Sequence, residues 1–355
     1  MLKAADFFPG TNREVNFRYD LLNGGNVKIG EVPLLSATVR FNSLAQIKRT
    51  ATFSLWEQES RNLDYLNDRI RPVMLLGGQE YPLGVFLLPS PARKAKGASV
   101  YREIAGYDLT QILLEDRFTS RYYLPAGTEY TEAVKRIVNS VGLLNMQIPA
   151  SGAVLARDRE YQAGTSKLDA INELLRECSY TSLWADAAGQ LRAAPYVQPS
   201  LRQPDISYLD DGQSCIIADS EGEELDLFNI PNVFVVTSST PDGGELSATY
   251  VNDSPLSPTS TVKRHRQIVD YREISDIAGI DELDAYVKRI AYAASSAYST
   301  VSFDTPLIPA HGYATTLYIT SSKLGIQGKY TETEWSMELK AGGRMTHKAR
   351  RAIQL

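Results

Sequence analysis

Two segments near the amino terminus, 35–41 and 50–56, alternate between apolar and polar residues at every second position. This period places the apolar side chains on one face, and their β-branched and aromatic character is typical of half-buried antiparallel strands. The segments 71–76, 83–88 and 100–107 have a similar composition and are separated by Gly and Pro turns. Five or six strands at this spacing predict a small barrel or sandwich, which we place in a first domain over residues 1–117.

The pattern changes to a helical period after residue 117. One apolar stripe consists of Val134, Ile137, Val138 and Val141, and a second consists of Leu168, Ile171, Leu174, Leu175 and Cys178. Both stripes follow an Ala-Gly-Thr triplet, at 126–128 and 163–165, so the segment repeats at an offset of 37 residues. Each copy ends in a turn and a short strand. We therefore predict an inserted α+β domain, 118–198, that holds duplicated strand–helix units.

Residues 199–232 are rich in Pro and acids, have little periodicity, and are expected to form a linker returning to the β domains. A second β domain, 233–355, is expected to carry one long helix over 281–299, with Asp281 as its N-cap. Strands are predicted at 233–237, 246–251, 300–303, 315–320 and 330–339. In the last of these, Thr331, Thr333 and Trp335 should share one face while Glu332 and Glu334 share the other.

The two β domains resemble each other in outline. The order T-A-T-F-S-L-W, R-P-V-M-L-L and Y-P-L-G-V-F-L-L-P-S-P-A-R in the first is matched by T-V-S-F-D-T-P, A-T-T-L-Y-I-T and I-Q-G-K-Y-T-E-T-E-W-S-M-E-L in the second. We therefore predict a mainly β, α+β chain, in which two similar antiparallel β domains, each a small barrel or sandwich, flank the inserted α+β region. A length of 355 residues suits several domains, since it exceeds what one compact core organises.

Charge is distributed unevenly along the chain. Residues 203–262 contain eleven acids and no Lys or Arg, whereas basic residues gather at 263–266 and 344–351. No large basic surface for binding nucleic acid is implied. The acidic stretch is either a set of solvated loops, or a surface that repels polyanions or pairs with a basic neighbour. No apolar run approaches the roughly 18 residues of a membrane span. The two cysteines, Cys178 and Cys215, are expected to be reduced.

Motifs that would indicate catalysis or phosphate binding, such as G-x-S-x-G, H-E-x-x-H and G-x-G-x-x-G, are missing. The three histidines, His265, His311 and His347, are far apart in sequence and have no partners at metal-ligand spacing. Asp210-Asp211-Gly212 is interpreted as a turn, and Glu221, Glu223 and Glu224 as part of a polar loop. We therefore assign no catalytic, cofactor-binding or metal-binding residue and expect no enzymatic activity and no cofactor.

The order of these segments resembles the hub proteins of bacteriophage tail tips and baseplates. The resemblance is carried by L-G-V-F-L-L-P-S-P-A-R, E-I-A-G-Y-D-L-T-Q-I-L-L-E-D-R, R-Y-Y-L-P-A-G-T-E-Y-T-E-A-V-K-R-I-V-N-S-V-G, L-F-N-I-P-N-V-F-V-V-T-S-S-T, N-D-S-P-L-S-P and S-T-V-S-F-D-T-P. It implies a homotrimer with two tube-like barrels per subunit, which closes a pseudo-sixfold ring below the hexameric tail tube.

The implied partners are the distal tail or tail-tube protein, the tape-measure protein and the tip or fibre proteins, with DNA only in transit through the lumen. The implied location is the virion, after assembly in the host cytoplasm. Some members of this family carry a fused hydrolase, for which we expect no room after Leu355. A host-surface or carbohydrate-binding adhesin is the alternative function, and a peptidoglycan-degrading enzyme acting through Glu221, Glu223 or Glu224 is a third.

Overall fold

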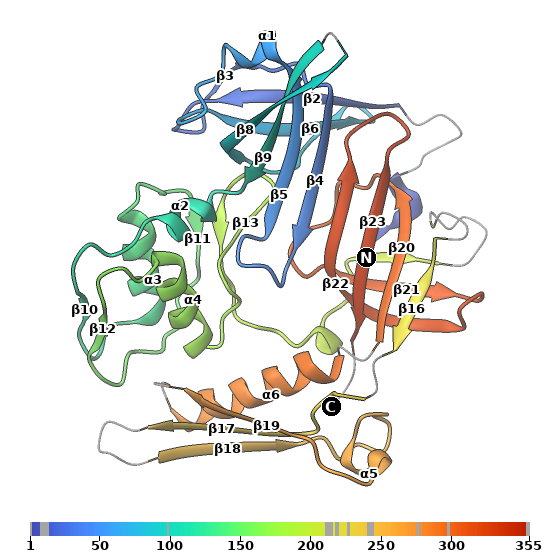
Figure 1. Ribbon diagram of the computed structural model, residues 1–355. Helices are drawn as coiled ribbons and strands as arrows, with labels where there is room; N and C mark the ends of the chain where they lie inside the picture. The colour runs from blue at the N-terminus through green and yellow to red at the C-terminus, as the bar shows by residue number, and fades with distance from the viewer. Residues whose placement is uncertain are drawn as a thin grey trace.

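The structure is a computed structural model that describes residues 2–7, 14–97, 99–209, 216, 220–225, 228–239, 245–274, 277, 279–296 and 299–352. Strands dominate these residues, which confirms the prediction of a mainly β chain. Figure 1 shows a blue strand group at the top, a red strand group at the right, a green group with helices at the left, and an orange helix over strands at the bottom.

The strands between residues 15 and 107 are here called the first β unit. They are β2 (Val15–Leu22), β3 (Lys28–Glu31), β4 (Ser36–Asn42), β5 (Arg49–Trp56), β6 (Arg69–Leu76), β7 (Gln79–Pro82), β8 (Phe86–Lys96) and β9 (Ser99–Tyr107), with helix α1 (Glu57–Ser60) after β5. Alternation in β5 is as predicted, because Ala51, Phe53 and Leu55 are buried and the residues between them are half-buried.

The second β unit is built from later parts of the chain. It consists of β15 (Ile206–Tyr208), β16 (Gly222–Leu225), β20 (Ser299–Pro306), β21 (Thr316–Ser321), β22 (Ile326–Glu338) and β23 (Arg344–Arg351). The segment 199–232, expected as a linker with little periodicity, thus contains the strands β15 and β16, as well as the 3-10 helix η2 (Pro199–Leu201). The basic segment 344–351, for which we predicted no strand, is β23.

Both units have the same strand order. In the first, antiparallel pairs give the order β4-β5-β9-β8-β6. In the second, antiparallel pairs give β16-β20-β23-β22-β21. Numbered along the chain, both sets follow the order 1-2-5-4-3. The long fourth strand of each set also shifts register against the fifth, at Leu87–Ser90 in β8 and at Glu332–Glu334 in β22. The segments that resemble each other in sequence therefore occupy equivalent positions.

The two units share one sheet and one hydrophobic core. The carboxyl-terminal part of β22 pairs with β4, and this pair joins the strands into a single 15-stranded sheet. At one end, β1 (Leu2–Lys3), which precedes the 3-10 helix η1 (Ala4–Phe7), pairs with β15. Side chains from both units, such as Phe53 and Trp335, belong to one buried cluster. Among the described residues we find no separately closed barrel of the kind expected from the sequence.

The inserted region repeats its elements at the predicted offset of 37 residues. Its elements are α2 (Thr110–Glu115), β10 (Tyr122–Leu124), α3 (Tyr130–Asn139), β11 (Met146–Gln147), β12 (Arg159–Tyr161), α4 (Lys167–Glu177), β13 (Trp184–Ala185) and β14 (Leu191–Arg192). The start of β12 lies 37 residues after that of β10, and α4 begins 37 residues after α3. The two first strands pair with each other in antiparallel fashion, and the helix stripes form a separate core.

The long helix predicted near the carboxyl terminus packs on a small sheet of its own. Helix α6 (Ile280–Ser296) covers the three-stranded sheet of β17 (Val233–Ser239), β18 (Glu245–Val251) and β19 (Val269–Ile274), with α5 (Thr261–Arg264) between the last two strands. Asp281 lies in the first turn of α6 and is not its N-cap. Within the described part of the chain, no helix combines the length and the apolar character needed to cross a membrane.

Candidate functional site

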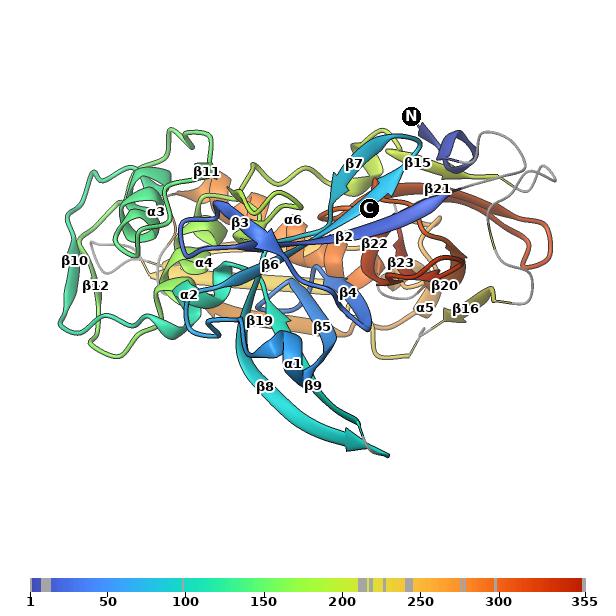
Figure 2. The ribbon, with the colours of Figure 1, turned by 90° about the horizontal axis from the view of Figure 1, so that it is seen from above.

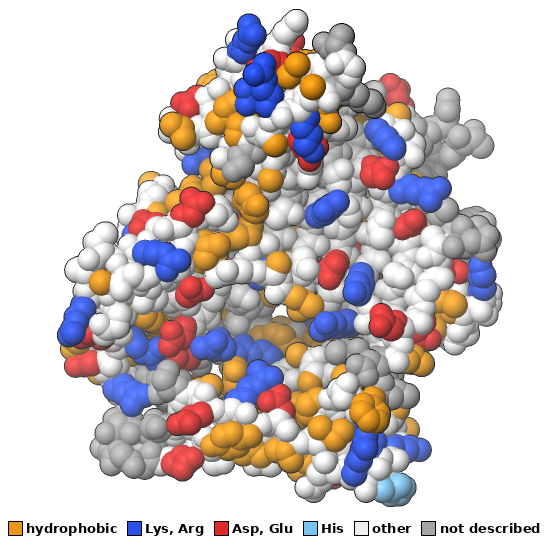
Figure 3. Space-filling model, in the orientation of Figure 1, with side chains coloured by type: hydrophobic (Ala, Val, Ile, Leu, Met, Phe, Trp, Pro, Cys, Tyr) orange, Lys and Arg blue, Asp and Glu red, His pale blue; other side chains and the backbone are white. Residues whose placement is uncertain are grey.

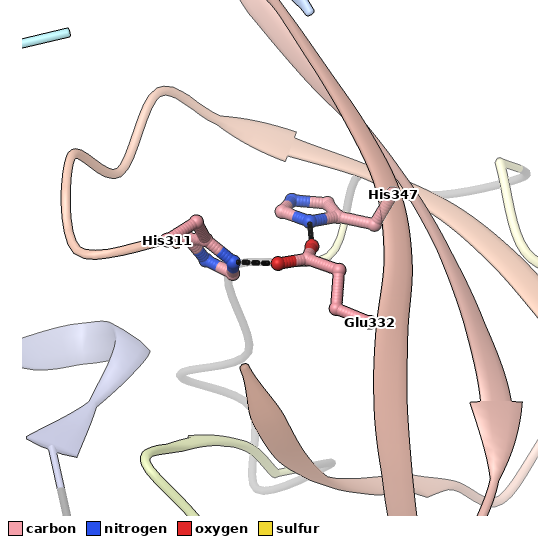
Figure 4. A group of neighbouring side chains, drawn as sticks. All are labelled: His311, Glu332 and His347. Atoms are coloured by element: carbon pink, nitrogen blue, oxygen red, sulfur yellow. Dashed lines mark hydrogen bonds and ion pairs between the residues drawn. The ribbon is translucent and has the colours of Figure 1, made fainter. Parts of the chain in front are cut away.

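A carboxylate lies between two histidines in the core of the second β unit (Figure 4). Glu332 belongs to β22, His347 to β23, and His311 to the loop between β20 and β21. The Nδ1 atoms of His311 and His347 lie 2.6 Å from different oxygens of the Glu332 carboxylate. The side chains of both histidines are 0% exposed, and that of Glu332 is 1% exposed. We call these three residues the His–Glu–His cluster.

A β-bulge turns Glu332 into the core. Its strand shifts register against β23 between Glu332 and Glu334, so the alternation of inward and outward residues slips by one position. Tyr330 and Glu332 are therefore buried before the bulge, and Trp335 and Met337 are buried after it. Our prediction that Glu332 and Trp335 lie on opposite faces of the strand was wrong for this reason.

The pairing of β22 with β23 brings together histidines that are distant in sequence. His347 lies on the same face of β23 as Met345 and Ala349, and all three residues are buried. His311 lies in a loop, as predicted, yet the whole residue, backbone included, is only 5% exposed. Its ring centre is 4.7 Å from that of His347. The third histidine, His265, lies apart on the surface, where it ends α5 in a left-handed conformation.

Both outer nitrogens of the cluster have hydroxyl partners. The Nε2 atom of His311 is 2.9 Å from the Tyr208 hydroxyl, and that of His347 is 2.8 Å from Oγ1 of Thr305. Burial raises the pKa of Glu332, but attraction to His311 and hydrogen bonds from both histidines outweigh it, and the pKa lies below its ordinary value. Burial lowers the pKa of His347 in spite of the nearby carboxylate. Two imidazoles and a carboxylate are a donor set for a metal ion, whereas complete burial leaves no access for a substrate.

The acids that were considered for glycoside chemistry are not arranged as a catalytic pair in a cleft. Glu223 and Glu224 lie on β16, and Glu221 directly precedes it. Glu223 accepts a hydrogen bond from Ser299 and lies next to Glu224 in sequence, so the two alternate across the strand. Asp210, Asp211, Gly212 and Cys215 lie outside the described residues. Burial raises the pKa of Cys178 to about 12, which leaves its thiol protonated and unreactive at neutral pH.

A basic pocket of about 620 Å³ opens where the first β unit, the inserted region and α6 meet. Its described lining includes Lys48, Arg176, Arg272 and Arg289 and contains no Asp or Glu. Arg289 donates to the carbonyl oxygens of Tyr180 and Arg176. Figure 3 shows Lys and Arg side chains around the hollow in the middle of this face. Arg272 is paired with Asp270, and the remaining basic residues give the pocket the charge to accept an anionic group. Nothing in the sequence pattern had indicated the pocket, because its lining comes from residues in 43–48, 172–182, 196, 272, 286–293 and 313.

Sequence comparison finds no family model and no curated protein that matches this chain. Comparison with solved structures finds matches over nearly the whole length. A tail protein from Neisseria meningitidis MC58 matches with a TM-score of 0.68 and 11% identity, covering 95% of this chain and 97% of the other. The 43 kDa tail protein of prophage MuSo2 from Shewanella oneidensis matches with a TM-score of 0.67 and 10% identity, covering 94% of this chain and 98% of the other.

A third structure, the prophage tail protein gp18 from Listeria monocytogenes EGD-e, matches with a TM-score of 0.57 and 12% identity, covering 94% of each chain. Identities this low establish a common fold. The chain therefore has the fold of phage tail proteins, as the resemblance in its sequence predicted.

Proposed function

We propose that this chain is the structural hub of a phage tail tip or baseplate. Three copies form a ring with pseudo-sixfold symmetry that adapts the hexameric tail tube to a threefold tip and lets DNA and the tape-measure protein pass. The observation that carries the proposal is the strand order shared by the two β units, because two equivalent units per chain allow a trimer to present six. Turnover of a substrate has no part in this mechanism.

The contact inside the chain suggests how the ring closes. The fourth strand of the second unit, β22, pairs with the first strand of the first unit, β4. Repeating this contact around a ring pairs the fourth strand of the first unit, β8, with the first strand of the second unit, β16, in the next copy. Beyond Leu87, β8 pairs only with β9 in the described part of the chain, and β16 only with β20. Both strands thus have an edge available for a partner.

The charges of these two edges are complementary. The β8–β9 hairpin reaches away from the rest of the chain (Figure 2), and its exposed side chains include Arg93, 3.6 Å from Glu57, and Lys94, 2.7 Å from Glu103. Glu221, Glu223 and Glu224 lie on or next to β16. Pro89 and Pro91 lack an N–H group, so pairing along β8 is limited to the residues that follow them, where the basic side chains lie. Opposite charges favour the association of β8 with β16 of another copy.

In this proposal the domains are 1–117, 118–198, 199–232 and 233–355. The first contributes one ring unit, and the last contributes the other together with β15 and β16 from 199–232. The tail-tube protein lies on one side of the ring and tip or fibre proteins on the other. The protein is then a virion component that assembles in the host cytoplasm.

Sedimentation equilibrium of the full chain tests the ring. We expect a trimer, and we expect Arg93→Glu with Lys94→Glu to shift it to monomer because like charges then face each other on β8 and β16. Adding Glu221→Lys with Glu224→Lys should restore the trimer. Arg121→Glu, on the inserted region, is the matched control and should leave the trimer intact. A monomer at every concentration, or a trimer indifferent to both charge reversals, contradicts the proposal.

A further inference from the structure

The protons of the His–Glu–His cluster are difficult to place. The hydroxyl of Thr305 has one proton, yet its oxygen lies 2.8 Å from the carbonyl oxygen of Pro306 and 2.8 Å from Nε2 of His347. If Thr305 donates to Nε2 of His347, a neutral His347 carries its proton on Nδ1 and donates it to Glu332, and the Pro306 carbonyl loses this donor. If Thr305 donates to Pro306 instead, then Nε2 of His347 must donate to Thr305. A neutral His347 then directs the bare Nδ1 lone pair at a carboxylate oxygen 2.6 Å away. A proton or a cation must lie between these two atoms.

A proton between Nδ1 of His347 and the Glu332 carboxylate then has an electrostatic cost, whichever of the two groups it is bound to. It makes His347 an imidazolium, or it moves to the carboxylate and neutralises Glu332 beside two imidazoles, and both side chains are only 0–1% exposed. A cation removes the difficulty, because both imidazoles can be neutral with their Nδ1 lone pairs directed inward. The carboxylate can then be ionised. Each Nε2 is left as a donor to a hydroxyl oxygen, that of Tyr208 or that of Thr305.

We propose that the His–Glu–His cluster binds a divalent transition-metal ion of the zinc class. The two Nδ1 atoms and the two oxygens of the Glu332 carboxylate supply four donors, which is the number that a closed structural zinc site uses. The ligand atoms all lie within 4.8 Å of one another, so the side chains must draw closer together to place every ligand atom about 2 Å from one ion. Imidazole and carboxylate together favour zinc over calcium or magnesium, which prefer oxygen ligands throughout.

The hydroxyl partners have the arrangement expected around such an ion. Metal-bound histidines usually donate their second ring nitrogen to an oxygen, which fixes the tautomer and orients the ring. Tyr208 and Thr305 come from β15 and β20 and do this for His311 and His347. The ion would therefore connect the loop before β21 to the pair β22–β23, with β15 and β20 around it. Its role is to stabilise the second β unit.

Metal analysis of the native full chain tests the proposal. The protein is expressed in zinc-supplemented medium, desalted, and measured by inductively coupled plasma mass spectrometry. We expect one equivalent of zinc per chain, and loss of the zinc in Glu332→Gln, which keeps the side-chain size and removes the charge. His265→Gln is the matched control, since this exposed histidine lies outside the cluster, and it should retain the full equivalent.

A second measurement applies if Glu332→Gln does not fold. Wild-type protein is treated with a strong chelator, and its thermal unfolding is followed with and without added zinc. We expect zinc to raise the unfolding temperature, because an ion that binds only the folded chain stabilises it. Wild-type protein with far less than stoichiometric metal and an unfolding temperature indifferent to zinc overturns the proposal and identifies the cluster as a hydrogen-bonded network.

Discussion

Arg49 and Asp108 connect the first β unit to the inserted region through buried charges. The Asp108 carboxylate accepts hydrogen bonds from the backbone N–H groups of Arg49 and Thr110, both at 2.9 Å. The Arg49 guanidinium donates to the Leu83 carbonyl and lies over the rings of Phe41 and Trp335. Burial raises the pKa of Asp108 and lowers that of Arg49 to about 10. Removing the hydrogen-bond partners of either buried charge would cost several kcal/mol, so the backbone around Arg49 and Asp108 is held in place.

Gly84 is the residue that makes room for this arginine. Its φ is +136°, and a Cβ atom there would lie 2.6 Å from Cδ of Arg49 and 2.7 Å from the Phe86 ring. We expect Gly84→Ala to lower the free energy of unfolding by about 2–4 kcal/mol, since backbone strain and overpacking add. Gly77→Ala is the control: its φ is +58° but a Cβ meets nothing within 4 Å, so its cost should be about 1 kcal/mol. If urea unfolding gave the same loss of unfolding free energy for Gly84→Ala and Gly77→Ala, the side chain of Arg49 would be able to move away from residue 84.

At the scale of elements, the repeated strand–helix units use different caps at the same position. Helix α3 begins after Glu129, whose carboxylate accepts hydrogen bonds from the N–H groups of Glu132 and Ser151 and from the Thr131 hydroxyl. Helix α4 begins after Ser166, 37 residues later, whose hydroxyl accepts from the N–H of Asp169. Partial burial raises the pKa of Glu129, but these hydrogen bonds and that of the Ser151 hydroxyl outweigh it and lower the pKa to about 2.

This difference predicts that only the first cap depends on pH. The folded-state pKa of Glu129 is below the value of about 4.3 expected in the unfolded chain, so its stabilisation is complete above pH 4.3 and is lost as pH falls toward 2. We expect the stability difference between wild type and Glu129→Gln to shrink over this range in urea unfolding. The difference between wild type and Ser166→Ala should stay at about 1 kcal/mol throughout. A pH-independent difference for Glu129→Gln would count against this cap.

The sequence predicted elements well wherever one local period persists. The alternation of β5 and the stripes of α3 and α4 follow directly from residue order, and so does the repeat at 37. Prediction failed where a strand changes phase or is very short. The bulge at Glu332 reverses the facing of half a strand, and β16 has too few residues to display a period. In β23 the buried residues Met345, His347 and Ala349 do occupy every second position, but the basic residues around them, Arg344, Lys348, Arg350 and Arg351, obscured the pattern.

The candidate cluster could not be predicted because its geometry depends on sheet register. His311 and His347 are 36 positions apart, and only the pairing of β22 with both β21 and β23 places Glu332 between them. Similarly, the sequence indicated two related β units but not that β4 and β22 would join them in one sheet. Strand order between distant segments is set by the packing of the whole core, which residue order reveals only in outline.

At the scale of the whole molecule, the proposed ring should respond to salt. The Debye length falls from about 10 Å at 0.1 M salt to about 3 Å at 1 M, so attraction between the basic edge of β8 and the acidic edge of β16 is screened. We expect sedimentation to show weaker trimer association in 1 M than in 0.1 M sodium chloride, with an unchanged fold by circular dichroism. Stronger association at high salt would indicate an interface dominated by apolar burial instead.

The shared strand β22 also affects how the protein is made. Its residues 334–338 cover the edge of β4 at 38–42, nearly the full chain apart. At about 5–20 residues per second, a ribosome needs about 15–60 s to synthesise the intervening polypeptide. Throughout that time the nascent first unit presents an open strand edge, which can pair with another chain. Late completion of an early domain should therefore make polysomes, where many unfinished copies are crowded together, the place where this protein is most prone to misassemble.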